Sequence, residues 1–388
     1  MTTVLESLAA ACAAPSPADA TTLPPEAYGS TELFTLETER IFKAGWVPLC
    51  RVEQVAEPGS YYSIDILGLP LVVTRDRAGA LHVLSRSCRH RWMDVCSGSG
   101  TARALQCPYH LWTYGLDGHL AGAPEMSGST GFDRADYALP VYRHDVWQGF
   151  LFVNIDGAAA SLGEQMAGLT SYVEPYRLGD YRTVATTDWG ECPWDWKIMV
   201  DNFMECYHHM GPHRQSLESE YPARLSYIDQ GGEHYSVMWT RQAPGYPAEP
   251  PFLAPVAPTL REEHRRKLMI FIAYPLLQVV IGPGFMYWLK TMPVGPGRMR
   301  LQLDIAMPPA AFEDPDFEQR RKELIETITG VHREDIDVCT RVQAAISSGA
   351  TGVGRLALLE QALWEFYRYL GRQLGVPVAA AEPLAATG

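Results

Sequence analysis

Two short groups of cysteine and histidine constrain this chain more than any other feature. The first group is Cys88-Arg89-His90, and the second, after sixteen intervening residues, is Cys107-Pro108-Tyr109-His110. Each group pairs one cysteine with one histidine at a spacing that places both side chains on a single turn. We therefore expect two tight loops that bring four ligands to one metal centre.

Two cysteines and two histidines can hold a [2Fe–2S] cluster, with thiolates on one iron and imidazoles on the other. Imidazole ligands raise the reduction potential, which suits a carrier of single electrons. Zinc accepts the same ligand types, but zinc fingers usually pair a two-cysteine half with a two-histidine half. The mixed halves favour the iron–sulfur cluster. Cys96 lies between the halves, outside their spacing, and is interpreted as a packing residue.

A second group of candidate ligands follows further along the chain. Asn202, Glu205 and His208 recur at intervals of three in a segment with helical spacing, so we expect them on one helical face. His213 does not match that face. The pair Gly211-Pro212 between the histidines can break the helix and return His213 toward His208.

Two histidines and one carboxylate form the facial triad that holds non-haem iron and leaves positions open for dioxygen. The carboxylate candidates are Glu334, Asp335 and Asp337, in a segment that we expect to open a helix. Asp335, in the expected first turn, is the preferred ligand. Spacing alone does not rank the three, and the alternative for each is a solvated carboxylate at a helix N-terminus.

Composition excludes several other classes of protein. The formal net charge of −13 and the lack of a lysine or arginine run argue against nucleic acid as a partner. No apolar run reaches the length of a membrane span. Eight cysteines in 388 residues are too sparse for a disulfide scaffold, which indicates a reducing, cytoplasmic location.

The pattern of strands and helices predicts three parts. Residues 1–45 form an N-terminal helical segment that packs on the catalytic domain, 46–156 an all-β domain, and 157–388 an α+β domain. Helices are expected near residues 30–45, 194–209, 314–348 and 355–374. The proline-rich segment 243–258 is interpreted as a functional lid or, equally, as a disordered surface excursion.

The two groups of residues, in this order, resemble those of the Rieske non-haem iron oxygenases, α-subunit type, over about residues 35–350. The resemblance implies an all-β Rieske domain beside a catalytic domain of the helix-grip type, an antiparallel sheet with helices. It also implies that Cys88, His90, Cys107 and His110 ligate the [2Fe–2S] cluster. His208, His213 and Asp335 would bind the mononuclear Fe(II).

The same resemblance implies a reaction and an assembly. Dioxygen would be the co-substrate, and electrons from NAD(P)H would arrive through a reductase or ferredoxin. Family members commonly form head-to-tail homotrimers in which the cluster of one subunit faces the iron of the next. Glu205 would then bridge His208 to His110 of a neighbour, where most members have an aspartate; Asn202 is the second candidate catalytic residue.

The sequence leaves the substrate open. Hydroxylation of an aromatic ring, oxidative demethylation and tailoring of a specialised metabolite all remain, with a preference for a small aromatic or N-methylated substrate. Aromatic residues expected near the pocket could form a cage for an ammonium group; they are Trp239, Tyr246, Phe271, Phe285, Tyr287 and Trp288. As a set they could equally be core residues, and for any single one of them the core position is favoured. A Rieske electron carrier without oxygenase activity is the alternative of another class.

Overall fold

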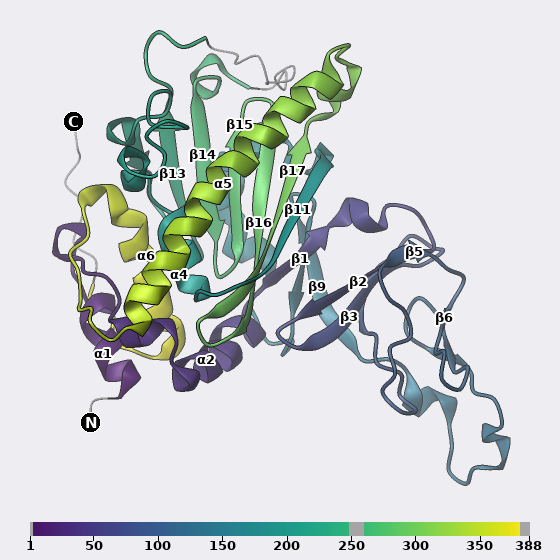
Figure 1. The fold of residues 1–388 in the computed structure, drawn as a ribbon. Helices are drawn as coiled ribbons and strands as arrows, with labels where there is room; N and C mark the ends of the chain where they lie inside the picture. The colour runs from purple at the N-terminus through teal and green to yellow at the C-terminus, as the bar shows by residue number, and fades with distance from the viewer. Residues whose placement is uncertain (1–2, 248–259, 381–388) are drawn as a thin grey trace. The chain divides into compact units, whose positions relative to one another are not determined.

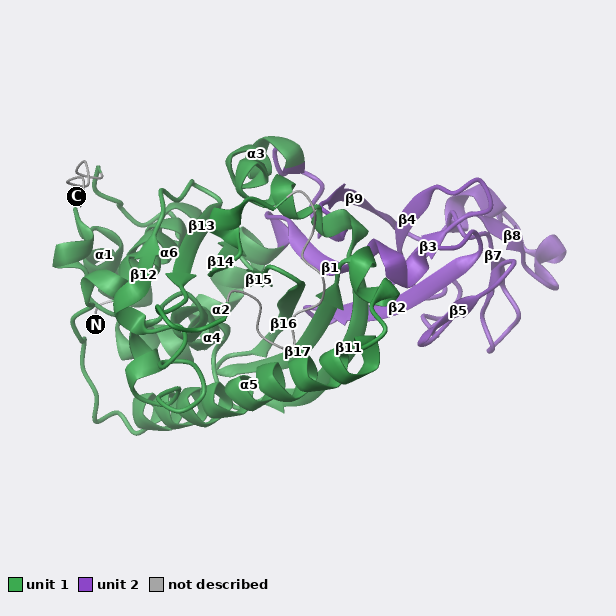
Figure 2. Ribbon diagram, turned by 90° about the horizontal axis from the view of Figure 1, so that it is seen from above, with its two compact units in different colours: residues 1–42, 163–388 green, residues 43–162 purple. Residues whose placement is uncertain are grey.

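The computed structural model describes residues 3–247 and 260–380. The chain forms two compact units, one made of residues 1–42 and 163–388 and the other of residues 43–162 (Figure 2). The division into three domains expected from the sequence stays a prediction. Most of the proline-rich segment 243–258 lies outside the described residues.

The smaller unit, residues 43–162, is built from antiparallel β-structure. Its main sheet has seven strands in the order β1 (Val47–Arg51), β10 (Phe150–Asn154), β9 (Val141–Trp147), β4 (Leu81–Ser85), β3 (Leu69–Arg75), β2 (Ser60–Ile66) and β5 (Ser99–Thr101). A three-stranded sheet contains β6 (Leu105–Gln106), β7 (Thr113–Tyr114) and β8 (Leu120–Gly122). Cys88 and Cys107 are buried in a core with Trp112 and Tyr114. The all-β character expected for this region is confirmed.

The larger unit contains a second seven-stranded antiparallel sheet. Its order is β11 (Arg182–Cys192), β17 (Arg298–Met307), β16 (Phe285–Gly295), β15 (Leu277–Gly282), β14 (Lys267–Ala273), β13 (Tyr235–Arg241) and β12 (Ser226–Ile228). Every residue of β15 is buried, as is typical of a strand covered on both faces.

Helices accompany this sheet. They are α1 (Val4–Cys12), α2 (Thr31–Glu37), α3 (Leu162–Val173), α4 (Trp196–Phe203), α5 (Phe317–Ser347) and α6 (Gln361–Leu374). In Figure 1, α5 runs diagonally across one face of the sheet, with α4 beside it. The predicted α+β, helix-grip architecture is confirmed. Within the two described ranges, no helix is both long and apolar enough to cross a membrane.

The helix expected near residues 194–209 ends earlier than predicted. Helix α4 stops at Phe203, and the short 3-10 turn Tyr207–Met210 follows. A local hydrogen bond competes with the helix here, because the backbone N–H of His208 donates to Oε2 of Glu205 at 2.9 Å. The expectation that Asn202, Glu205 and His208 share one helical face was therefore wrong.

Helix α5 also differs from its expected form at the candidate ligand. It is continuous from Phe317 to Ser347, so Asp335 lies in its interior and not in its first turn. The carboxylates near residue 335 are therefore distributed around a helix axis. Which of them faces the core depends on how the helix packs.

A buried ion cluster joins the start of α4 to the end of α2. The Nζ atom of Lys197 lies 2.7 Å from Oε1 of Glu37 and 2.7 Å from Oδ1 of Asp195. All three side chains are at most 3% exposed. Burial raises the pKa of the Glu37 carboxyl to about 7, although Lys197 acts in the opposite direction. One cation thus neutralises two carboxyl groups that water does not reach.

Replacing Lys197 by methionine is expected to lower the free energy of unfolding by about 3 kcal/mol, because it leaves buried carboxyl groups without their cation. Chemical denaturation monitored by circular dichroism measures this change. Lys322→Met, on the exposed side of α5, is the control and should shift stability by less than about 0.5 kcal/mol. Equal stability of Lys197→Met and the wild type would show that the buried ion cluster does not stabilise the fold.

Candidate metal centres and active site

The two cysteine–histidine groups fold as a pair of similar tight turns. The backbone N–H of Trp92 donates to the carbonyl of Cys88 at 2.9 Å, and that of Leu111 donates to the carbonyl of Cys107 at 3.0 Å. Trp92 and Leu111 both have a positive φ, at 59° and 60°. The turns expected around the metal centre are therefore present, and each carries one cysteine and one histidine.

These four side chains fit the ligand set of a [2Fe–2S] cluster. Cys88 and Cys107 are 1% and 2% exposed. The rings of His90 and His110 lie with their centroids 4.6 Å apart. Their Nδ1 atoms are buried and have no hydrogen-bond partner among the described residues. Two unpartnered imidazole nitrogens beside two buried thiols form the mixed donor set that such a cluster requires.

Tyr114 supports this centre from the core. Its hydroxyl lies 3.3 Å from Sγ of Cys88 and accepts the backbone N–H of Arg89 at 3.0 Å. Burial raises the pKa of the Tyr114 hydroxyl, so the hydroxyl stays protonated and can donate a hydrogen bond to the sulfur. Hydrogen bonds to cluster sulfurs are among the factors that set the reduction potential.

Tyr114→Phe is expected to lower the reduction potential of the cluster by about 40 mV, the equivalent of one hydrogen bond of about 1 kcal/mol. The bond favours the reduced cluster, whose sulfurs carry more negative charge. A redox titration followed by electron paramagnetic resonance measures the potential. Tyr137→Phe, whose ring packs on Trp112 of the same core, should leave it unchanged. An unchanged potential in Tyr114→Phe would show that the hydrogen bond from Tyr114 does not tune the cluster.

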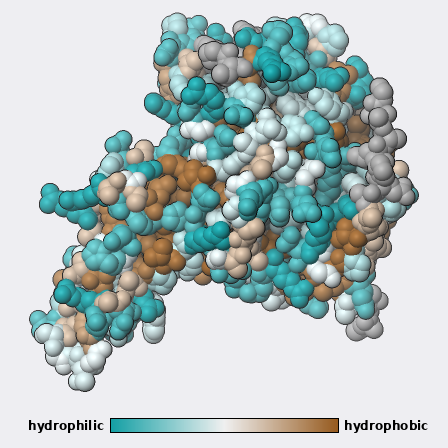
Figure 3. All heavy atoms as spheres, turned by 180° about the vertical axis from the view of Figure 1, so that it is seen from behind, coloured by the Kyte–Doolittle hydropathy of each residue, from teal (hydrophilic) through white to brown (hydrophobic). Residues whose placement is uncertain are grey.

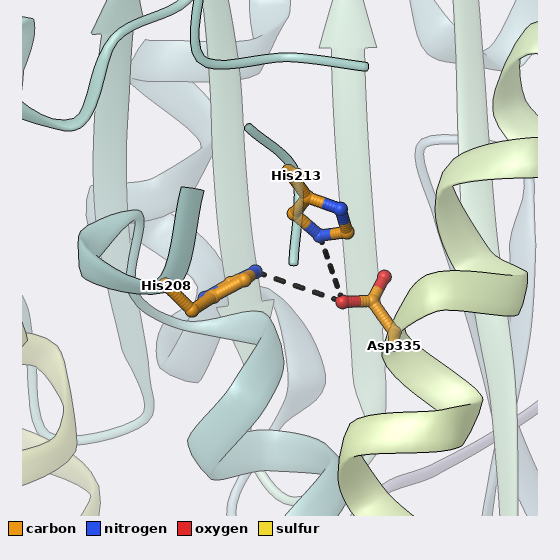
Figure 4. A group of neighbouring side chains, drawn as sticks. All are labelled: His208, His213 and Asp335. Carbon is orange, nitrogen blue, oxygen red and sulfur yellow. Dashed lines mark hydrogen bonds and ion pairs between the residues drawn. The ribbon is translucent and has the colours of Figure 1, made fainter. Parts of the chain in front are cut away.

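The second centre is formed by His208, His213 and Asp335. One potential ligand atom from each lies within 4.8 Å of the others. Oδ1 of Asp335 is 2.9 Å from Nε2 of His213 and 3.6 Å from Nε2 of His208. Figure 4 shows the three side chains pointing toward one another, with Asp335 reaching from α5. This is the two-histidine, one-carboxylate set of non-haem iron sites.

Each of these three side chains is held by a further polar group. Nδ1 of His208 is hydrogen-bonded to Oε1 of Glu205, and Nδ1 of His213 lies 2.6 Å from Oε2 of Glu334. Such partners fix the imidazole tautomers and leave both Nε2 atoms free to bind a metal. Burial alone would raise the pKa of the Asp335 carboxyl, but its contacts with His213 and His332 hold that pKa well below its usual range.

The structure separates the three carboxylate candidates. Asp335 lies beside both histidines, whereas Glu334 accepts from His213 and from the Oγ hydroxyl of Ser216 at 2.6 Å. Asp337 is exposed and pairs with Arg341 at 3.0 Å. The contact of Glu334 with His213 was not among the features expected from the sequence. No spacing signal pointed to it, since the two residues meet only in the folded chain.

A cavity of about 130 Å³ opens beside this centre. Its lining includes the three candidate ligands together with Asn202 and Glu205. Asn202 and Glu205 therefore lie beside the candidate iron site, and their catalytic role stays a prediction. Of the six aromatic residues expected near the pocket, Phe285 and Tyr287 line it. The others are outside this lining; they are Trp239, Tyr246, Phe271 and Trp288.

An all-β unit with a cysteine–histidine cluster site and an α+β unit with a facial triad define a class, the iron-dependent oxygenases that draw electrons from a second metal centre. Comparisons with known proteins give the family. Residues 45–143 match the model of the Rieske [2Fe-2S] domain, and residues 176–375 match that of the ring hydroxylating alpha subunit (catalytic domain).

Similar proteins agree with these matches. The carnitine monooxygenase oxygenase subunit of Acinetobacter baumannii is 30% identical over 88% of this chain and 90% of its own. The chloroplastic choline monooxygenase of Spinacia oleracea is 26% identical over 92% and 79%. A solved quaternary ammonium Rieske monooxygenase, with 24% identity, superposes over 92% and 96% with a TM-score of 0.81.

The chain belongs to the Rieske non-haem iron oxygenases. It is accordingly an oxidoreductase whose cofactors are a [2Fe–2S] cluster and a mononuclear iron. It acts on a small molecule with dioxygen, and a reductase system supplies its electrons.

Proposed function

We propose that this oxygenase oxidises an N-methylated ammonium compound at a carbon bonded to nitrogen. One oxygen atom of O₂ enters a C–H bond, and the other leaves as water with two electrons and two protons. The resulting hydroxylated carbon releases the amine, as its C–N bond breaks and a carbonyl forms. The named substrates of the relatives, carnitine and choline, are ammonium compounds of this type.

The character of the cavity is the observation that carries this proposal. Phe285 and Tyr287 line it, with their rings nearly parallel and the ring centroids 6.4 Å apart. The faces of aromatic rings attract ammonium groups. Glu220 also lines it, and its Oε1 is fixed by Nε2 of Gln242 at 2.8 Å. Among the described lining residues there is no lysine or arginine. These features favour a cation over a carboxylate-bearing anion.

The residues of the chain have distinct tasks in this proposal. His208, His213 and Asp335 would hold the iron, and Cys88, His90, Cys107 and His110 would hold the cluster. When bound, the iron supplies the site of dioxygen activation and the cluster supplies one stored electron. Glu205 keeps the proton of His208 on Nδ1, so that Nε2 stays a ligand. The apolar cavity wall limits the access of water.

We also propose the head-to-tail homotrimer, with Glu205 bridging His208 to His110 of a neighbour. Exposed apolar side chains lie near the cluster ligands in one unit and near His208 in the other. Trp92, Tyr109 and Leu111 of the cluster turns are 81%, 51% and 53% exposed, and Tyr207 and Met210 beside His208 are 46% and 49% exposed. On the face drawn in Figure 3, apolar side chains reach the surface among hydrophilic ones. Exposed apolar patches of this kind are typical of protein interfaces.

Trp92→Glu tests the trimer. Sedimentation should show three chains in the wild-type particle and single chains in the variant, which should keep both metals yet lose turnover. A monomeric and active wild type would contradict the assembly.

We also propose a cytoplasmic location. It is supported by the eight cysteines, which are all free of disulfides.

The substrate proposal is tested by titrating the reduced protein, without oxygen, against a panel of N-methylated ammonium compounds and small aromatic hydrocarbons. We expect the ammonium compounds to change the ligand-field spectrum of the ferrous site, and to yield a carbonyl compound and an amine once oxygen is admitted. A response to the aromatic compounds alone would replace this proposal with ring hydroxylation.

A further inference from the structure

His332 is a histidine of the second centre that is not one of its candidate ligands. It precedes Asp335 by three residues on α5, so both side chains lie on the same face of the helix. Nδ1 of His332 lies 3.2 Å from Oδ2 of Asp335. Oδ1 of Asp335 instead faces Nε2 of His213 and of His208. The two oxygens of Asp335 therefore have separate partners.

The other nitrogen of His332 has no such partner. Its side chain is 4% exposed, and Nε2 is buried without a hydrogen bond to any residue in the described ranges. Because Nδ1 faces a carboxylate, it carries the ring hydrogen, and Nε2 is left with an acceptor lone pair. A buried acceptor without a donor is destabilising and rare in folded proteins.

The surroundings of His332 link it to the substrate cavity. Its ring lines the cavity together with Asp335 and Tyr287. It packs edge-to-face on Tyr287, with centroids 5.1 Å apart, and lies 6.1 Å from the ring of Trp189. These aromatic rings fix the imidazole in place. Because His332 lines the cavity, a molecule bound there can supply a hydrogen-bond donor to Nε2.

We propose that His332 positions Asp335 through Nδ1, so that Oδ1 faces the iron, and accepts a hydrogen bond from the substrate through Nε2. This inference rests on the proposed function and narrows it, because the substrate is then an N-methylated ammonium compound that also carries a hydroxyl or N–H group. His332 is a positioning residue for Asp335 and a specificity-determining residue for the substrate.

The first arm of the test concerns Asp335. His332→Asn keeps an N–H donor near the place of Nδ1 and removes Nε2, whereas His332→Leu removes both. Replacing a residue that supports a metal ligand typically lowers metal affinity by about 10–100-fold. We therefore expect His332→Leu to lose iron to a chelator at least about tenfold more readily than His332→Asn. The exposed neighbour Arg333, changed to glutamine, is the control.

Wild-type iron retention by His332→Leu would overturn the positioning role. Should His332→Leu fail to fold, His332→Asn carries this arm by its ferrous ligand-field spectrum. That spectrum should match the wild type, because the donor to Asp335 is retained. A spectrum that changes as it does on removal of Asp335 would contradict the assignment of Nδ1.

The second arm concerns the substrate and uses two matched cations, (2-hydroxyethyl)trimethylammonium and ethyltrimethylammonium, which differ by one hydroxyl. Dissociation constants come from the spectrum of the reduced protein without oxygen. The wild type should bind the hydroxylated cation about fivefold to tenfold more tightly, as one hydrogen bond predicts. In His332→Asn this preference should vanish while ethyltrimethylammonium binds as before.

A preference that survives in His332→Asn, or one that is absent from the wild type, would overturn the acceptor role. A wild type that binds neither cation would contradict the proposed function itself, and with it the acceptor role. The chelator experiment of the first arm would then decide the positioning role independently.

Discussion

Asp335→Ala is expected to lose the mononuclear iron and turnover while keeping the [2Fe–2S] cluster. The carboxylate is buried, lies 2.9 Å from Nε2 of His213, and completes the only set of one carboxylate and two histidines found among the described residues. Two histidines alone bind ferrous iron weakly. Iron per chain should fall from about three to about two, with unchanged acid-labile sulfide. Metal analysis and the visible spectrum of the cluster measure both quantities.

Asp337→Asn is the matched control on the same helix. Asp337 is exposed and pairs with Arg341, so its loss should change neither iron content nor activity. Wild-type iron content in Asp335→Ala would assign the ligand elsewhere. Glu334, which contacts His213 through Oε2, would then be the next residue to replace.

Glu205→Ala is expected to keep both metals and to lower turnover by about 100-fold or more, the upper range for residues that support metal ligands. Glu205 holds Nδ1 of His208 and accepts its backbone N–H, and in the proposed trimer it is the link to the cluster of a neighbour. The readout is the rate at which the reduced cluster is reoxidised in the presence of substrate and oxygen.

Glu205→Gln separates the two tasks of this residue. The amide can still accept a hydrogen bond from His208, but it carries no charge, so reoxidation should be slowed less than in Glu205→Ala. Glu191→Gln, on the exposed end of β11, is the control with no expected effect. Wild-type reoxidation in Glu205→Ala would contradict the bridging role.

The elements that the sequence predicted well are those set by short-range patterns. The mixed cysteine–histidine groups require two similar turns, and two such turns are present around Cys88 and Cys107. The apolar run from Leu268 to Ile281 reads as buried strand, and it forms most of β14 and β15, with Pro275 in the turn between them. Both features depend on neighbours in the chain, so a single sequence contains the necessary information.

Features that depend on competition or on packing were predicted less well. Helical spacing continues past Phe203, but the hydrogen bond from His208 to Glu205 ends the regular structure there. Similarly, Glu334, Asp335 and Asp337 differ only in their direction from the axis of α5. The packing of α5 against the rest of the unit, which the sequence does not reveal, turns Asp335 toward the histidines.

A single turnover tests the central claim of two cooperating metal centres most directly. The cluster and the mononuclear iron are both reduced, so that each would supply one of the two electrons that the reaction consumes. Excess reductant is removed, and the protein is mixed with oxygen and an N-methylated ammonium compound that carries a hydroxyl group. We expect release of an amine and a carbonyl compound, reoxidation of the cluster only when the ammonium compound is present, and neither event in Asp335→Ala. Product from Asp335→Ala, or cluster reoxidation by the wild type without product, would contradict the claim.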